Sequence, residues 1–159
     1  MAGEASRVVK ITLDEASIAR RGPDIDHERA VAMFDLVEQN HFQLIEIEAS
    51  GPYHLHLGVV DSKLLIEVRA TDDSDLARIE LPLAPFRRLV KDYFTICDSY
   101  FAAVRSAPQS RIEAIDMGRR ALHNEGSELL QERLADKLEI DFDTARRLFT
   151  LLCSLHLRI

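Results

Sequence analysis

The chain has 159 residues, of which 47% are hydrophobic and 30% are charged, with only 6 Gly and 5 Pro. This length and composition are typical of a globular protein and exclude a disordered or fibrous one. The formal net charge of −7 argues against broad attraction to nucleic acid or to an anionic membrane, because either surface would repel the average field of the protein. A local basic patch remains compatible with binding an anion.

The start of the chain gives no targeting signal. Residues 1–6 lack the basic stretch and apolar core of a secretory signal peptide. No uninterrupted apolar segment approaches the roughly 20 residues that a membrane-spanning helix needs. We therefore expect a cytoplasmic protein with no membrane contact. The two cysteines, Cys97 and Cys153, lie in apolar, helix-like runs, which predicts buried thiols rather than a redox pair.

The first half of the chain predicts mostly strands with one helix. Residues 7–13 alternate well enough to form a strand. Asp24 or Asp26 is then expected to cap a helix whose apolar positions repeat at helical spacing and which ends near Asn40.

After that helix the apolar period changes to two, and turn residues separate four short segments. These segments predict four consecutive strands, at residues 42–48, 53–59, 64–69 and 77–81. Together with residues 7–13 they predict an antiparallel β-meander of about five strands. In the second of the four, His54 and His56 lie on the face opposite to the apolar side chains.

The second half of the chain, residues 83–159, predicts helices. Pro82 and Pro85 end the sheet and suit the first turn of a helix. From Phe86 to Val104 a wide apolar stripe predicts an amphipathic helix that lies across the sheet as the central core helix.

Residues 109–137 allow either one long helix or two. Gly118 and Gly126 interrupt the pattern, and each is compatible with a close-packing contact on a single helix. Alternatively, residues 124–127 end one helix and cap the next, which is the reading that we favour. Asp141 or Asp143 then caps the final helix. With no repeat or linker in the sequence, we expect one α+β domain over residues 1–159.

The densest polar cluster lies at residues 116–128. In a helix, Asp116, Arg119 or Arg120, and His123 recur at spacings of three and four, which places a carboxylate, a guanidinium and an imidazole on one side. Such a set can orient a phosphate or carboxylate ligand, with the histidine as acid or base near neutral pH. The candidates for catalysis are Asp116, His123 and Glu125, and those for ligand binding are Arg119, Arg120, Asn124 and Glu128. The structural alternative, a surface ladder of ion pairs, explains the same residues and carries more weight.

Pairs of adjacent arginines recur along this acidic chain, at Arg20–Arg21, Arg87–Arg88, Arg119–Arg120 and Arg146–Arg147. If two or three of these pairs converge in the fold, they form a phosphate-binding patch, because guanidinium forks match phosphate geometry. Adjacent helical residues point about 100° apart, so each pair is expected to contribute one side chain to a given site. Solvated arginines or structural salt bridges are the alternative.

Other chemical signatures are missing from the sequence. There is no phosphate-cradling glycine loop, nucleophile elbow, zinc-type cysteine spacing or HExxH helix. His54 and His56 share a face of a strand, which is a weak basis for a ligand pair. We therefore predict no metal site, and the sequence indicates no cofactor.

Several long segments together carry a resemblance to a known family: residues 13–18, 26–32, 86–88, 91–94, 115–130 and 141–151. On these motifs the whole chain resembles the uncharacterised protein family numbered 0262, found in alphaproteobacteria. The resemblance implies a bacterial cytosolic protein with one domain. It implies no activity, ligand or site residue, because the family has no established function to carry over.

Three readings of function follow. The first is a non-enzymatic binding or regulatory module, with a protein partner or a homodimer that hides the apolar end of the last helix near Ile159. The alternative is an enzyme that acts on a phosphorylated or nucleotide-like substrate through the cluster from Asp116 to Glu128. In a third reading a local arginine patch contacts nucleic acid, which the negative net charge otherwise disfavours.

Overall fold

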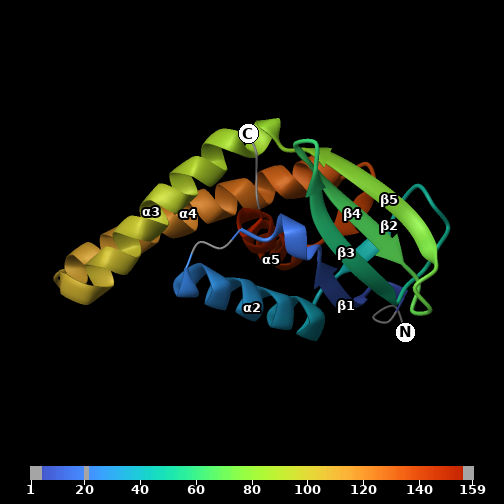
Figure 1. Cartoon of the computed structure of the whole chain (residues 1–159), viewed down its shortest axis with the longest axis horizontal. Coiled ribbons are helices and arrows are strands. Elements are labelled where there is room, and N and C mark those ends of the chain that lie inside the picture. Colours follow the sequence, from blue (N-terminus) through green and yellow to red (C-terminus); the bar gives the residue numbers. More distant parts are fainter. Residues whose placement is uncertain (1–4, 20–21, 156–159) are drawn as a thin grey trace.

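The computed structural model describes residues 5–19 and 22–155, and within them it has an α+β fold with two sheets and four α-helices (Figure 1). The α+β class predicted from the sequence is therefore confirmed. The strands and helices follow in the order β1 (Val8–Leu13), α2 (Pro23–Glu38), β2 (Phe42–Leu44), β3 (Tyr53–Val60), β4 (Lys63–Arg69), β5 (Asp75–Pro82), α3 (Arg87–Ser106), α4 (Gln109–Leu134), β6 (Leu138–Ile140) and α5 (Phe142–Cys153).

The larger sheet is mixed rather than purely antiparallel. Its strand order is β1-β3-β4-β5, and β3, β4 and β5 form the predicted antiparallel meander. Strand β1, however, runs parallel to β3, with Ile11 opposite Leu55. The long connection through α2 returns the chain to the same end of the sheet, which is what a parallel pair requires. The prediction of a fully antiparallel meander is wrong at this strand.

The predicted strand at residues 42–48 does not join that sheet. Only residues 42–44 are extended, and they pair with β6 in a separate two-stranded sheet, where Phe42 lies opposite Ile140. Beyond Leu44 the chain bends, and Ile45 and Ile47 are half exposed. Three-residue β6 has too short a pattern to be recognised in the sequence.

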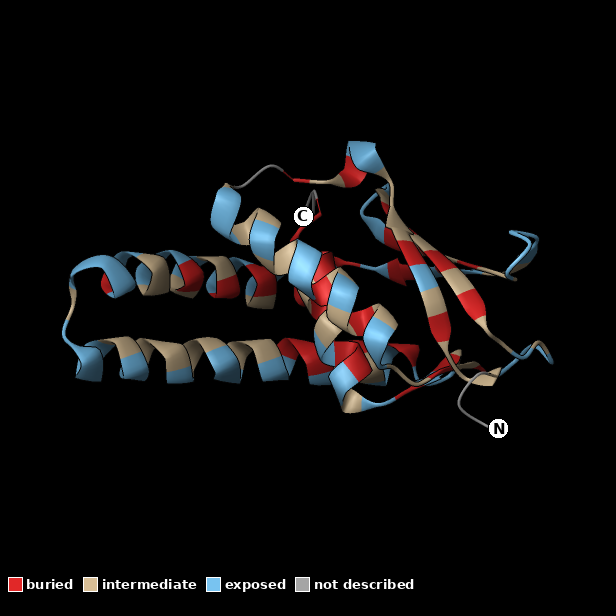
Figure 2. Ribbon diagram, turned by 90° about the horizontal axis from the view of Figure 1, so that it is seen from below, coloured by how far each residue is buried: buried red, intermediate tan, exposed pale blue. Residues whose placement is uncertain are grey.

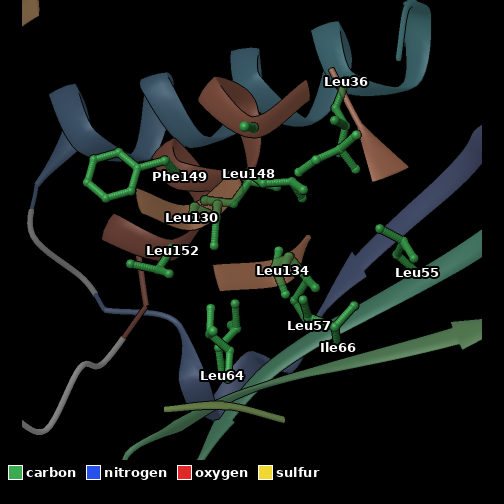
Figure 3. Packing of buried hydrophobic residues seen from close by; sticks show 14 of the residues in the cluster. Leu36, Leu55, Leu57, Leu64, Ile66, Leu130, Leu134, Leu148, Phe149 and Leu152 are labelled. Carbon is green, nitrogen blue, oxygen red and sulfur yellow. The ribbon is translucent and has the colours of Figure 1, made fainter. Parts of the chain in front are cut away.

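Helix α5 and the second half of α4 cover the sheet and form the core with it (Figure 3). Helix α5 buries one complete side, and Asp141 caps its first turn by accepting a hydrogen bond from the Thr144 backbone nitrogen at 2.9 Å. The buried leucines of α4 and α5 lie across from apolar residues of the strands: Leu130, Leu134, Leu148 and Leu152 on the helices, and Leu55, Leu57, Leu64 and Ile66 on the strands.

Helix α3 does not lie across the sheet as predicted. It packs along α4 in an antiparallel hairpin whose tip extends beyond α2 and the sheet (Figures 1 and 2). An apolar stripe predicts that one side of a helix is buried, but not against which element. Cys97 on α3 and Cys153 on α5 are both buried, as predicted.

Residues 109–134 form one helix, so the two-helix reading that we favoured is wrong. Both interrupting glycines are close-packing contacts on that single helix. A β-carbon at Gly118 would lie 2.7 Å from Cδ1 of Ile96, and one at Gly126 would overlap with three atoms of the Phe149 ring. Because these glycines have no side chain, α3 and α5 can pack closely against α4.

The capping prediction for α2 is also wrong. Gly22 is the N-cap and Pro23 opens the first turn, while Asp24 and Asp26 lie inside it. The helix ends at Glu38, close to Asn40 as predicted. The Asn40 side chain bonds to β1: its Oδ1 accepts from the Val8 nitrogen and its Nδ2 donates to the Val8 oxygen, both at 2.8 Å.

Two expectations fall on residues outside the described ranges, namely the Arg20–Arg21 pair and the apolar end of the chain at Ile159. One buried apolar cluster contains residues from both halves of the chain, from β1 to α5. The assignment of residues 1–159 to one domain stays a prediction.

The Gly126 contact predicts an asymmetry between two alanine substitutions. Gly126→Ala gains about 1 kcal/mol of helix propensity, but its β-carbon meets a rigid, fully buried ring, and overpacking of this kind costs roughly 1–3 kcal/mol or more. We expect a net loss of about 1 to 2 kcal/mol in the free energy of unfolding, measured by urea denaturation.

Gly118→Ala is the matched control, because its β-carbon meets the end of a flexible isoleucine side chain. The same propensity gain then offsets a small rearrangement, so we expect stability within about 1 kcal/mol of the wild type. Equal losses in the two variants would contradict the assignment of Gly126 as the tighter contact.

Candidate functional site

A cleft of about 440 Å³ lies between helices α2, α4 and α5, with Tyr93 of α3 on its lining. We call it the interhelical cleft. It is lined by His27, Glu28, Val31, Ala32, Asp35, Tyr93, Arg119, Arg120, His123, Arg146, Arg147 and Thr150. Three of the seven site residues predicted from the sequence are among them, and all three belong to α4.

Arg119 joins three helices at one side of the cleft. On its own helix, Nη2 and Nε lie 2.8 and 3.2 Å from Oδ1 of Asp116. Its Nη1 donates to Oε1 of Glu28 on α2 at 3.2 Å, and its guanidinium carbon lies 4.2 Å from the ring centroid of Tyr100 on α3. With its donors engaged in this way, Arg119 acts first as a clamp between helices.

The two carboxylates that hold Arg119 have opposite pKa shifts. Burial raises the pKa of Glu28, and the charge of Arg119 offsets part of that effect. The hydrogen bond from Arg119 lowers the pKa of Asp116, and Arg120, 2.9 Å from Oδ2 of Asp116, acts in the same direction. Asp116 therefore binds both neighbouring arginines and does not line the cleft.

His123 also lines the cleft and is half-buried. Its Nε2 is 2.7 Å from Oγ1 of Thr150 on α5, and its ring packs at 5.4 Å from Tyr93 and 5.3 Å from Phe149. Burial lowers the pKa of His123 to about 4, with smaller contributions from Arg146 and Arg119. The imidazole is thus uncharged at neutral pH, which differs from the titration near pH 7 expected from the sequence.

The protonation of the other buried groups beside the cleft is also set by burial. It raises the pKa of the Tyr93 phenol well above its usual range and that of the Cys97 thiol to about 11. Both groups keep their protons at neutral pH. Because the thiolate is the reactive form of cysteine, the Cys97 thiol is inert there.

The remaining candidates do not join this site. Asn124, Glu125 and Glu128 are exposed and lie outside the cleft lining. Successive helical residues turn by about 100°, so positions one, two and five after His123 face other directions. The structure therefore divides the polar cluster at residues 116–128 between the cleft and the surface.

Sequence reasoning missed half of the cleft. From α2 it overlooked Glu28, Val31 and Asp35, which share one side at spacings of three, four and seven. From α5 it named Arg146–Arg147 only as one of several arginine pairs. The repetition of these pairs was the one feature of the sequence that could have indicated the cleft.

Two of those pairs, Arg119–Arg120 and Arg146–Arg147, converge on the cleft, and both members of each pair line it. The expectation that each pair would contribute one side chain is wrong, because long arginine side chains from two facing helices reach into the same space. The described residues thus have an α+β fold with an arginine-lined cleft between three helices.

The chain belongs to the uncharacterised protein family UPF0262, whose sequence profile matches residues 5–158. A UPF0262 protein of Azorhizobium caulinodans is 56% identical over 152 residues, covering 95% of this chain and 94% of that one. One from Rhizobium leguminosarum bv. trifolii is 56% identical over 158 residues and 99% of both chains. The relatives come mostly from alphaproteobacteria, which confirms the resemblance, and nothing in their names indicates an enzyme activity. No solved structure was found to match the chain.

Two further features were searched for in the described part of the chain. No group of three or more His, Cys, Asp or Glu side chains there is arranged to hold a metal ion. His54 instead contacts Asp73 at 2.8 Å, and His56 contacts Thr12 at 2.7 Å. None of the described helices combines the length and apolar character needed to cross a membrane.

The buried His123 predicts a loss of stability in acid. Its pKa is about 4 in the folded protein against an ordinary value of 6.5, so between these values the unfolded chain binds more protons. The free energy of unfolding therefore falls as pH is lowered through this window, by up to about 1.4 kcal/mol per pH unit, and His123 adds no pH dependence above it.

Two measurements check this prediction. The His123 ring resonances should titrate with a midpoint near 4 in NMR, and a midpoint above 6 would contradict the buried, uncharged state. In His123→Gln, whose amide can still bond to Thr150, the loss of stability between pH 7 and pH 5 should be smaller than in the wild type.

Proposed function

We propose that the protein is a non-enzymatic binding module that takes a small anionic ligand in the interhelical cleft. One observation carries this proposal: two arginine pairs that are separate in the sequence line the same cleft in a chain of net charge −7. Clustered guanidinium groups repel one another unless an anion lies between them. A phosphate or carboxylate in the cleft offsets that repulsion.

Three of the four arginines have hydrogen-bonding capacity for such an anion. Arg120 is exposed, and only its Nη2 takes part in the ion pair with Asp116. Arg146 lies 3.9 Å from Asp143, which is too far for a hydrogen bond, and Arg147 donates to the Asp143 backbone oxygen at 3.2 Å. A guanidinium has five N–H donors, so each of the three retains several for a ligand.

The geometry around His123 supports binding rather than catalysis. A general base must reach the proton that it abstracts and must have a pKa near the working pH. Nε2 of His123 is bonded to Thr150 and the ring is uncharged, while Asp116 is occupied by two arginines. No observation favours an enzyme that uses the cluster from Asp116 to Glu128.

Other parts of the functional reading stay predictions. They are a cytoplasmic location, a regulatory role, and a homodimer or protein partner. An extended nucleic acid fits the cleft less well than a small anion, since Glu28 and Asp35 also line it.

A thermal-shift panel at constant ionic strength tests the proposal with phosphate, sulfate and citrate against chloride. An anion that binds only the folded state stabilises it by about 2.7 kcal/mol at 100 times its Kd, which is a shift of several degrees. Arg146→Gln/Arg147→Gln should lose most of the shift that wild type shows with phosphate.

The matched control is Arg87→Gln/Arg88→Gln, which removes the same charge from an exposed pair outside the cleft. This control should keep the wild-type shift. Equal loss in both double variants would mean that net charge, not the cleft, governs binding, and no shift with any anion would overturn the proposal.

A further inference from the structure

The polar residues of the cleft are divided between two walls of opposite sign. The cationic groups come from α4 and α5, with Arg120, Arg146 and Arg147 as the arginines that have donors to spare. A phosphomonoester carries about 1.5 to 2 negative charges and three acceptor oxygens at neutral pH. Its three oxygens can accept hydrogen bonds from several guanidinium groups at once, whereas a carboxylate has only two oxygens for this purpose.

The opposite wall is helix α2, which contributes two carboxyl groups two turns apart, Glu28 and Asp35. Arg119 holds Glu28. Within the described part of the chain, the Asp35 side chain takes part in no hydrogen bond or ion pair, although it is half-buried and lines the cleft. An ionised carboxylate accepts hydrogen bonds only, so it fits hydroxyl groups of a ligand and repels a second phosphate.

The cleft also has an apolar part to its lining. Val31 and Ala32 of α2 and the ring of Tyr93 form this part. The cleft volume of about 440 Å³ lies within the range of roughly 300–1,000 Å³ that is typical of small-molecule sites. An inorganic ion fills only a small part of that space.

We propose that the ligand is a phosphomonoester that carries hydroxyl groups, either a sugar phosphate or a nucleoside monophosphate. Its phosphate lies on the arginine side and its hydroxyl groups face Asp35. This inference rests on the proposed function, because it names the ligand of the same cleft. It extends that function because α2 then binds the uncharged part of the ligand, through hydrogen bonds from the hydroxyl groups to Asp35.

Isothermal titration calorimetry with four probes tests the proposal: inorganic phosphate, ribose, ribose 5-phosphate and adenosine monophosphate. A hydrogen bond to a charged group contributes about 1.5–3 kcal/mol, which is at least a tenfold change in Kd. Ribose 5-phosphate should therefore bind at least about tenfold more tightly than inorganic phosphate, and ribose should bind more weakly than either.

The variant Asp35→Asn tests the contribution of α2 separately from that of the arginines. It should reduce the advantage of ribose 5-phosphate over inorganic phosphate to about threefold or less, without weakening inorganic phosphate itself. Asp98→Asn, at an exposed position of α3 outside the cleft, is the matched control and should leave both affinities unchanged. Circular dichroism confirms that the variants are folded.

The outcomes distinguish this inference from the function on which it rests. If inorganic phosphate binds through Arg146 and Arg147 but ribose 5-phosphate binds no more tightly, the ligand class is wrong and the anion-binding function stands. If no phosphate compound binds, both are overturned. If Asp35→Asn prefers ribose 5-phosphate over inorganic phosphate as strongly as the wild type does, the role of α2 is overturned. Tighter binding of adenosine monophosphate than of ribose 5-phosphate would support the nucleotide form, and the reverse would support the sugar phosphate.

Discussion

The contact between Gly126 and Phe149 is the constraint on which the candidate site depends. Because Gly126 has no side chain, the Phe149 ring lies directly on α4 and sets how closely α5 approaches. That approach places Thr150 2.7 Å from His123. It also brings the arginine pair of α5 to the same cleft as the pair of α4. A larger residue at position 126 would separate the two helices and with them the two cationic groups.

The second constraint is electrostatic. Arginines from two helices concentrate positive charge, and the charge of Arg146 contributes to the low pKa of His123. Asp116 and Glu28 neutralise part of this charge through Arg119, which also ties α2 to the hairpin. The remaining guanidinium groups are turned toward solvent and the cleft. A cluster that is only partly neutralised by its own protein is suited to an anionic ligand, because the ligand removes repulsion that the fold leaves in place.

The candidate site was predictable only in part. The helical spacing of Asp116 and Arg119 correctly indicated their ion pair. The arginine pairs were considered for a phosphate-binding patch if they converged, and two of them do line one cleft. The α2 wall was not foreseen, because Glu28 and Asp35 look like ordinary surface acids until another helix packs opposite them. Asn124, Glu125 and Glu128 were included for their position in a polar run, although proximity in sequence does not place helical residues on one side.

What the sequence by itself determined was local: the alternation of β3, β4 and β5, a cap at Asp141 or Asp143, and the apolar sides of α3 and α5. These follow from spacings of a few residues, where periodicity and turn chemistry act. The tertiary structure decided the partners, since β1 pairs in parallel with β3, β2 pairs with β6, α3 packs on α4, and α4 continues through two glycines. The physical reason is that an apolar side must be buried by something, and which surface buries it depends on contacts between residues far apart in the chain. The arginine-lined cleft is a product of those distant contacts.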